Sequence, residues 1–255
     1  MNIVIVEDSE LVRSQLLRRL AAEPRFHVVG VAAGESEALA LIRELRPDAV
    51  LLDVALSPGS GLRVLEGLLR EGPATRVLVL GNDLDPALRS ACRKLGASGC
   101  YDKTDELEAC LSHLVAWLPP LPADEERRLL ALQSVHLLDT PWQAAFSDIA
   151  RLAAEIVGAP IAFISLVDRE RQWFLAGHGI DLGETSRAVS LCAHAIVGRE
   201  LMEVPDARLD RRFFDNPLVR GEPHVVSYAG VPLVLSSGDA LGTLAVVDRR
   251  PRILG

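Results

Sequence analysis

The chain has 255 residues, 49% of them hydrophobic and 24% charged, which excludes a disordered protein and allows two ordinary domains. The net charge of −8 divides evenly, because residues 1–118 hold 13 basic and 17 acidic side chains and the rest hold 14 and 18, so neither half resembles a nucleic-acid-binding domain. No apolar run approaches the roughly 18 residues of a membrane span. The four cysteines lack the paired spacing of disulfide or zinc sites. The first ten residues, MNIVIVEDSE, do not have the pattern of a signal peptide. We therefore expect a cytoplasmic protein without nucleic-acid or membrane partners.

Residues 1–118 alternate short apolar runs with helical patterns. The apolar runs indicate strands, and the stretches between them place leucines and alanines at i, i+3 and i+4, on one face of a helix. Strands alternating with helices form βαβ units, which predict a five-stranded, doubly wound parallel sheet, and we assume the order 2-1-3-4-5. The five expected strands cover residues 3–6, 28–31, 49–52, 77–80 and 99–101.

Three prolines in the segment LPPLP end this pattern, because proline cannot continue a helix. We predict a first domain over 1–118, a linker over 119–123 and a second domain over 124–255. The second domain would open with a helix over 124–138, followed by another helix over about 142–157. Consecutive strands joined by short turns, with a further helix over 189–197, then predict an α+β domain with an antiparallel sheet. These strands are expected at 161–167, 172–176, 201–204, 225–235 and 241–247.

Acidic residues follow two strands of the predicted parallel sheet. Glu7 and Asp8 end the first strand and Asp53 ends the third, and these strands are neighbours in the assumed order. Three carboxylates in one pocket repel each other, which a hard cation such as Mg²⁺ relieves. Asp53 is then the candidate nucleophile. Lys103, one of two lysines among 27 basic residues, follows the fifth strand and would supply a compact ammonium group to a phosphoryl oxygen.

Residues 1–117 resemble a response-regulator receiver domain of two-component signalling, of flavodoxin-like fold, in the segments IVIVEDS, AVLLDVAL, GSGLRVL, VLVLGN and GASGCYDK. The resemblance implies that Asp53 accepts a phosphoryl group from a histidine kinase or phosphotransfer protein. It implies Mg²⁺ ligation by Asp8, Asp53 and the backbone carbonyl of Ala55, a contact of Glu7 through water, and a phosphoryl contact of Lys103. Receivers catalyse only their own phosphorylation and dephosphorylation, so we expect no other enzyme activity.

Two positions depart from the receiver pattern. The fourth strand is usually followed by Ser or Thr, whose hydroxyl binds the phosphoryl group, but Gly81 stands here. The fifth strand usually carries a Tyr or Phe that turns inward in response, but Cys100 stands here and Tyr101 follows it. A shift of one residue sends a side chain to the opposite face of a strand. The chemistry at Asp53 is therefore expected to be retained while its conformational readout is altered.

Residues 124–250 resemble a GAF domain, a sensory or dimerising module, in segments including HLLDTPWQAAFSDIARLAAEIVGAPIAFISLVD, SLCAHAIV and YAGVPL. The loop after residue 204 lacks the pattern of cyclic-nucleotide-binding members, so the ligand is not identified and an empty pocket is an alternative. The helix from residue 124 could pack on its own sheet or pair with a second copy, and we favour a homodimer. The candidate pocket residues are Trp173, Cys192, His194, Phe213 and Tyr228.

The leading hypothesis is a Mg²⁺-dependent response regulator whose receiver passes its signal to, or combines it with, the GAF domain. A second hypothesis is a pseudo-receiver or phosphate sink beside a ligand-sensing GAF domain. A third is a phosphatase with an aspartyl-phosphate nucleophile, although the sequence VEDS lacks the Asp-x-Asp spacing of haloacid-dehalogenase-like enzymes. The chain could also be part of a longer signalling enzyme.

Overall fold

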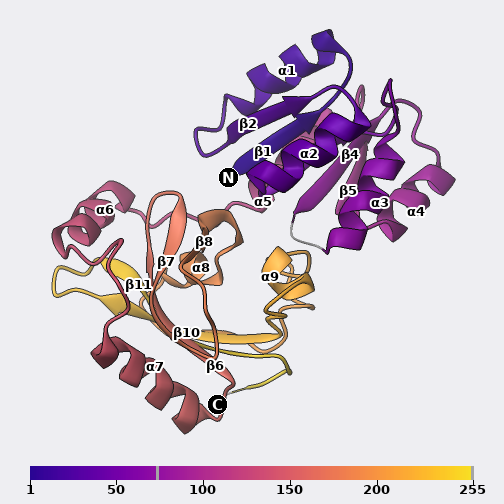
Figure 1. Ribbon diagram of the computed structural model, residues 1–255. Helices are drawn as coiled ribbons and strands as arrows, with labels where there is room; N and C mark the ends of the chain where they lie inside the picture. The colour runs from indigo at the N-terminus through magenta and orange to yellow at the C-terminus, as the bar shows by residue number, and fades with distance from the viewer. Residues whose placement is uncertain (73–74, 254–255) are drawn as a thin grey trace. The chain divides into compact units, whose positions relative to one another are not determined.

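The computed structural model describes residues 1–72 and 75–253. The chain divides into two compact units, Met1–Leu118 and Pro119–Gly255, which Figure 1 shows in indigo to magenta and in rose to yellow. Gly255, the predicted end of the second domain, lies outside the described residues. Within the described part of the chain, no helix combines the length and apolar character needed to cross a bilayer.

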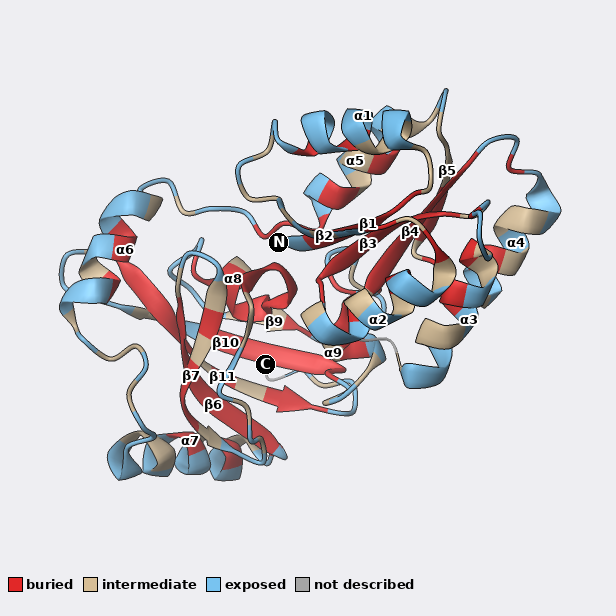
Figure 2. Cartoon of the chain, turned by 45° about the horizontal axis from the view of Figure 1, so that its top comes forward, coloured by how far each residue is buried: buried red, intermediate tan, exposed pale blue. Residues whose placement is uncertain are grey.

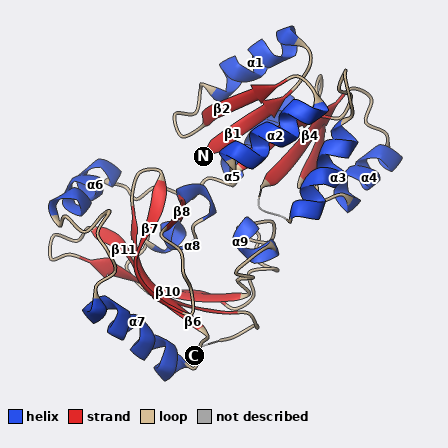
Figure 3. Cartoon of the chain, in the orientation of Figure 1, coloured by secondary structure: helices blue, strands red, loops and turns tan. Residues whose placement is uncertain are grey.

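The first unit is a parallel sheet between two layers of helices, as predicted. Its strands follow the order β2-β1-β3-β4-β5. Figure 2 shows α1 and α5 on one face of this sheet and α2, α3 and α4 on the other, and Figure 3 distinguishes the helices from the strands by colour. The elements are β1 (Asn2–Val6), α1 (Glu10–Leu20), β2 (His27–Ala32), α2 (Glu35–Leu45), β3 (Ala49–Asp53), α3 (Gly61–Glu71), β4 (Arg76–Gly81), α4 (Pro86–Lys94), β5 (Gly99–Asp102) and α5 (Leu107–Ala116).

Burial on both faces explains the continuous apolar runs of the central strands. Every residue of β3 and β4 is buried, as are the last four residues of β1. Parallel strands covered by helices on both sides have no solvent face, so their sequences do not alternate between apolar and polar residues. The three strands end at one edge of the sheet, and β1 pairs directly with β3, which brings the residues after them together.

The second unit is a six-stranded antiparallel sheet of order β8-β7-β6-β11-β10-β9. Side chains of β6 alternate between its two faces: Phe163 packs in a cluster with α8, whereas Leu166 packs with α6. The elements are α6 (Glu125–Ser134), α7 (Ala144–Val157), β6 (Ile161–Val167), β7 (Arg171–His178), β8 (Glu184–Ser186), the 3-10 helix η1 (Arg187–Val189), α8 (Leu191–Ala195), β9 (Met202–Val204), α9 (Pro217–Arg220), β10 (Ser227–Val234) and β11 (Ala240–Asp248).

Helix α6 ends at Ser134, whereas the sequence predicted a helix to residue 138. His136 adopts a left-handed backbone with φ of 51°, which stops the helix even though apolar residues continue. Those residues turn back and pack with Leu129 and Leu132 of α6. This leucine face packs on the helix's own sheet, which is the first of the two arrangements expected for this helix. The face is therefore not available for pairing with a second copy.

Of the helix predicted over 189–197, the structure shows α8 (Leu191–Ala195); Val189 is the last residue of η1, and Ser190 separates η1 from α8. The backbone of Ser190 is extended, with φ of −77° and ψ of 120°, and its hydroxyl accepts a hydrogen bond from the Ala193 amide at 3.0 Å, which caps α8. The same hydroxyl donates to the side-chain carbonyl of Gln172 on β7. A residue at an N-cap has a non-helical backbone and cannot also belong to a helix that precedes it, which accounts for the break.

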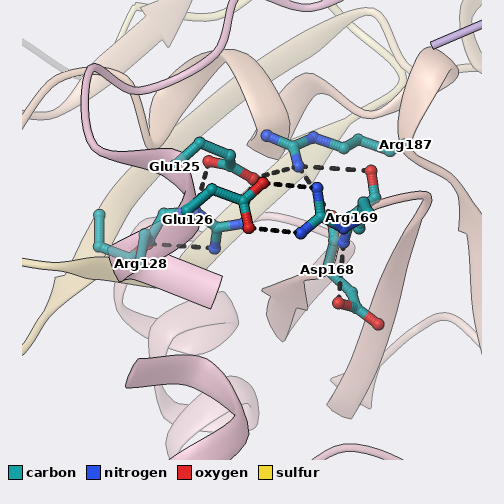
Figure 4. Close-up of polar contacts among 7 residues, drawn as sticks. Glu125, Glu126, Arg128, Asp168, Arg169 and Arg187 are labelled. Atoms are coloured by element: carbon teal, nitrogen blue, oxygen red, sulfur yellow. Dashed lines mark hydrogen bonds and ion pairs between the residues drawn. The ribbon is translucent and has the colours of Figure 1, made fainter. Parts of the chain in front are cut away.

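A buried charge cluster fixes the start of α6 to the second sheet (Figure 4). Glu125 Oε1 accepts hydrogen bonds from Arg187 at 2.6 Å and from Arg128 at 2.7 Å, and its Oε2 accepts a second bond from Arg128 at 2.8 Å. Arg128 is 2% exposed and Arg187 5%. A neighbouring pair, Glu126 with Arg169, makes two bonds of 2.7 Å at the surface. The first cluster is therefore shielded from water and the second is not.

This cluster predicts acid sensitivity of the second unit. Burial alone would raise the pKa of Glu125, but the hydrogen bonds from Arg128 and Arg187 outweigh it and lower the pKa below its ordinary value. A lowered folded pKa stabilises the fold above the unfolded pKa of about 4.3, and this contribution is lost as the pH falls through the folded value. We expect Glu125→Gln to destabilise the unit at pH 7 and to differ less from wild type below pH of about 4 in urea unfolding. An equal difference at both pH values would contradict this.

Candidate functional site

Three carboxylates and one ammonium group meet at the carboxyl edge of the parallel sheet. Asp53, the last residue of β3, is 3% exposed, and Glu7, directly after β1, is 1% exposed. One oxygen each from Glu7, Asp8 and Asp53 lie within 4.8 Å of one another. The ammonium of Lys103, after β5, lies 2.7 Å from Asp53 Oδ2 and 2.8 Å from Glu7 Oε2. The structure therefore brings together all four side chains that the sequence predicted.

The acids of this site carry more negative charge than Lys103 alone neutralises. Burial raises the pKa of Glu7; the hydrogen bond from Lys103 lowers it and the charge of Asp53 raises it, and the net shift is upward. Burial lowers the pKa of Lys103, but the bonds to Asp53 and Glu7 exceed this effect and hold its pKa above the ordinary value. Oxygen donors with an uncompensated negative charge match what a hard divalent cation requires, so the donor set fits Mg²⁺.

Backbone contacts fix the direction of two of the carboxylates. Asp53 Oδ1 accepts a hydrogen bond from the Ala55 amide at 3.0 Å, and Asp8 Oδ2 accepts one from the Ser57 amide at 3.0 Å. Arg13 on α1, which no motif of the sequence singles out, donates to the carbonyls of Glu7 and Asp8 at 2.8 and 3.0 Å. An arginine one turn into the helix after an acidic strand end is the signal that could have identified it.

Gly61 at the start of α3 lies against the chain that leaves β3. A Cβ at this position would stand 2.2 Å from the carbonyl oxygen of Asp53 and 2.7 Å from the Cα of Val54. We expect Gly61→Ala to push the backbone at Asp53 aside and to destabilise the first unit by about 1–3 kcal/mol, as overpacking does. Urea unfolding of this variant beside Gly67→Ala is the measurement, because a Cβ at Gly67 meets the flexible end of Leu39 instead of backbone. Equal losses would contradict the role of Gly61.

The two atypical positions are both filled by apolar packing. A Cβ at Gly81 would lie 2.7 Å from Leu84 Cδ2 and 2.8 Å from Val54 Cγ1, so the space of the usual hydroxyl is occupied. Cys100 faces α4, and burial raises the pKa of its thiol to about 11, so the thiol is neutral. Tyr101 faces α5, where its hydroxyl lies 2.5 Å from His113 Nδ1. The aromatic ring is thus on the opposite face from Cys100, as strand alternation predicted.

The pocket residues expected in the second unit do not all share one cavity. Cys192 and Tyr228 line a cavity of about 30 Å³ together with Phe163, Gln172 and Phe174. Trp173 follows Gln172 on β7 and so faces away from it, under the guanidinium of Arg171. His194 and Phe213 contact each other edge to face, with ring centroids 4.8 Å apart. Trp173, His194 and Phe213 are therefore not lining residues.

This cavity is too small for an ordinary ligand. About 30 Å³ accommodates a water molecule, whereas ligand pockets usually measure about 300–1,000 Å³. Burial raises the pKa of the Cys192 thiol, which accepts hydrogen bonds from Gln172 at 3.3 Å and Tyr228 at 3.4 Å. A neutral, buried thiol is a poor nucleophile, which argues against covalent attachment of a chromophore at Cys192.

Comparisons with known proteins agree with the two-unit architecture. A family model described as response regulator receiver domain matches residues 3–114, and one described as GAF domain matches residues 141–254. A cyclic di-GMP phosphodiesterase of Pseudomonas aeruginosa, PA2567, is 46% identical over 52% of this chain and 23% of its own length. A protein-glutamate methylesterase/protein-glutamine glutaminase of Anaeromyxobacter dehalogenans is 32% identical over 62% of this chain and 43% of its own.

The chain thus spans less than half the length of these curated relatives. Among solved structures, a two-component response regulator of the LuxR family from Aurantimonas is 26% identical, with a TM-score of 0.43, over 52% of this chain and 97% of that one. Both predicted families are confirmed by the family matches, and the fold class by the two sheets. The chain contains a response regulator receiver domain followed by a GAF domain, and is a signalling protein.

Proposed function

We propose that this chain is a Mg²⁺-dependent response regulator in which Asp53 accepts a phosphoryl group from a histidine kinase or phosphotransfer protein. The observation that carries the proposal is the buried group of Asp53, Glu7, Asp8 and Lys103 at the carboxyl edge of a receiver sheet. The phosphorylated receiver then passes its signal to, or combines it with, the GAF domain. The activities named for the longer relatives are not carried over, because the matched part covers a minor share of each.

The proposed chemistry is a single displacement at phosphorus. A carboxylate oxygen of Asp53 forms a bond to phosphorus while the bond from phosphorus to the donor's imidazole nitrogen breaks, and the electron pair stays on that nitrogen. Asp8, Asp53 and the Ala55 carbonyl would hold Mg²⁺, with Glu7 acting through water, and the cation would neutralise phosphoryl oxygens. The ammonium group of Lys103 already contacts Asp53, and it would contact a phosphoryl oxygen of the new acyl phosphate.

The direct test is treatment of the full chain with acetyl phosphate or phosphoramidate, read by intact mass. We expect one phosphoryl adduct per chain in the presence of Mg²⁺ and almost none with excess EDTA. Size-exclusion chromatography of the same samples tests the expected homodimer. No adduct under any of these conditions would refute the proposed function.

Removing one acidic ligand should weaken Mg²⁺ binding in the absence of any phosphodonor. We expect Asp8→Asn to raise the Mg²⁺ dissociation constant by about tenfold or more, because Mg²⁺ in proteins relies on one or two carboxylates. Isothermal titration calorimetry with MgCl₂ measures this, and Glu44→Gln, an exposed acid-to-amide change on α2, is the control. Equal affinities of the two variants would contradict the assignment of Asp8.

A further inference from the structure

Arg89 on α4 joins the connection between β4 and α4 to two other parts of the first unit. Its Nε donates to the Leu84 carbonyl at 3.0 Å, its Nη1 to the Cys100 carbonyl on β5 at 2.6 Å, and its Nη2 to Glu106 Oε2 at 2.6 Å. One guanidinium therefore joins the loop before α4, the edge strand β5 and the segment before α5. Its planar, forked donors suit this kind of bridging, which lysine cannot reproduce.

Further bonds hold the same loop from the other side. Glu106 Oε2 also accepts from the Asp102 amide at 2.8 Å, and Asp102 Oδ2 accepts from the Asp83 amide at 3.1 Å. Asp85 caps α4 by accepting from the Leu88 amide at 2.7 Å. None of these partners belongs to the group around Asp53. The loop between Gly81 and α4 is thus fixed by contacts that do not depend on a phosphoryl group.

The position that usually couples this loop to the phosphoryl group carries no side chain here and is surrounded by apolar neighbours. At Gly81 there is no hydroxyl to be drawn toward Asp53, and Leu84 and Val54 occupy the volume that such a side chain needs. Leu84 is 7% exposed and belongs to the core that also contains Cys92 and Cys100. The aromatic residue of β5, Tyr101, faces α5 and not this loop. A ligand shifts an equilibrium only through contacts that differ between two states, and here the hydroxyl that would make such a contact is absent at Gly81.

We propose that Arg89 is a latch that holds the β4–α4 loop on β5 whether or not Asp53 is phosphorylated, so that the surface formed by α4 and β5 stays constant. The proposal rests on the phosphoacceptor role of Asp53 given above and defines how that site is regulated. A partner that recognises this surface binds both forms equally, and the phosphorylated state is recognised only at the carboxyl edge around Asp53 itself.

The test is hydrogen–deuterium exchange of the full chain with Mg²⁺, with and without beryllofluoride as the phosphoryl mimic. Bound beryllofluoride is detected separately by ¹⁹F NMR. With the mimic bound, we expect amides 82–89 to exchange at the same rate as without it, within about threefold, since exchange reports local opening. A larger change would overturn the latch and leave the phosphoacceptor role intact. Absence of bound beryllofluoride would overturn that role and the latch with it.

Substitutions of Arg89 test whether its hydrogen bonds, and not the packing of the loop as a whole, slow amide exchange in residues 82–89. We expect Arg89→Gln to speed exchange of amides 82–89 by about tenfold or more, because three bonds that close the loop are lost. Arg93→Gln, an exposed change on the same helix, should leave exchange unchanged. If Arg89→Gln does not fold, Glu106→Gln removes the ion pair alone and should give a smaller increase. Wild-type exchange rates in the folded Arg89 or Glu106 variant would overturn the proposal.

Discussion

Asp53→Asn should abolish formation of the phosphoryl adduct, with no modification detectable by intact mass under conditions that fully modify wild type. The amide oxygen is a far weaker nucleophile than the carboxylate, and the exchange removes one negative charge from the pocket. The fold should be retained, because the amide keeps the size of the side chain and its oxygen can still accept from the Ala55 amide. The expected loss is therefore chemical and not structural.

The control for this experiment is a second acid-to-amide change that spares the nucleophile. Asp48→Asn alters a buried aspartate at the other end of β3, where Asp48 Oδ2 accepts from the Asn2 amide at 2.7 Å. We expect Asp48→Asn to be phosphorylated like wild type. An adduct on Asp53→Asn, mapped by peptide mass to another residue, would remove Asp53 from its proposed role.

The first domain was predictable because each of its strands can be recognised from its own short sequence, and the strand order then shows which strand ends meet. Each buried strand of the parallel sheet is a continuous apolar run, and the strand order places the ends of β1 and β3 side by side. From these two facts the meeting of Glu7, Asp8 and Asp53 follows. The contact of Arg13 with the carbonyls of Glu7 and Asp8 did not follow, because it depends on the rotamer of a long side chain.

The second domain was less predictable because packing overrides its local patterns. Ser190 caps α8 and ends the apolar helical stretch before it, and its hydroxyl also bonds to Gln172 of a distant strand, a contact that no local pattern reveals. His136 ends α6 with a left-handed backbone, and the residues Leu137 and Leu138 after it pack against the cluster that contains Leu166 and Leu241 of the sheet. The face of Trp173 followed from alternation along β7, but which face borders the cavity depended on where α8 lies. Short strands such as β8 have too few residues to show any period.

Arg128→Ala should destabilise the GAF domain by about 3–5 kcal/mol, the loss expected when one partner of a buried ion pair is removed. Glu125 would keep Arg187 but lose both bonds to Arg128, and the Ala240 carbonyl would lose a donor at 3.4 Å. The Glu125 carboxylate, whose side chain is only 11% exposed, would keep one of its two guanidinium partners. We expect a lower midpoint in urea unfolding followed by the fluorescence of Trp142 and Trp173, which lie in this domain.

Arg169→Ala provides the matched control, because it removes an arginine with equally good geometry from an exposed pair. Arg169 and Glu126 have side chains 58% and 74% exposed, and exposed pairs contribute about 0–1 kcal/mol. The two ion pairs differ in burial and hardly in bond length. A large loss of unfolding free energy in Arg128→Ala and a small loss in Arg169→Ala would therefore assign the effect to desolvation of Glu125. Equal losses would mean instead that α6 is held by its leucines, and that the charge cluster only sets its orientation.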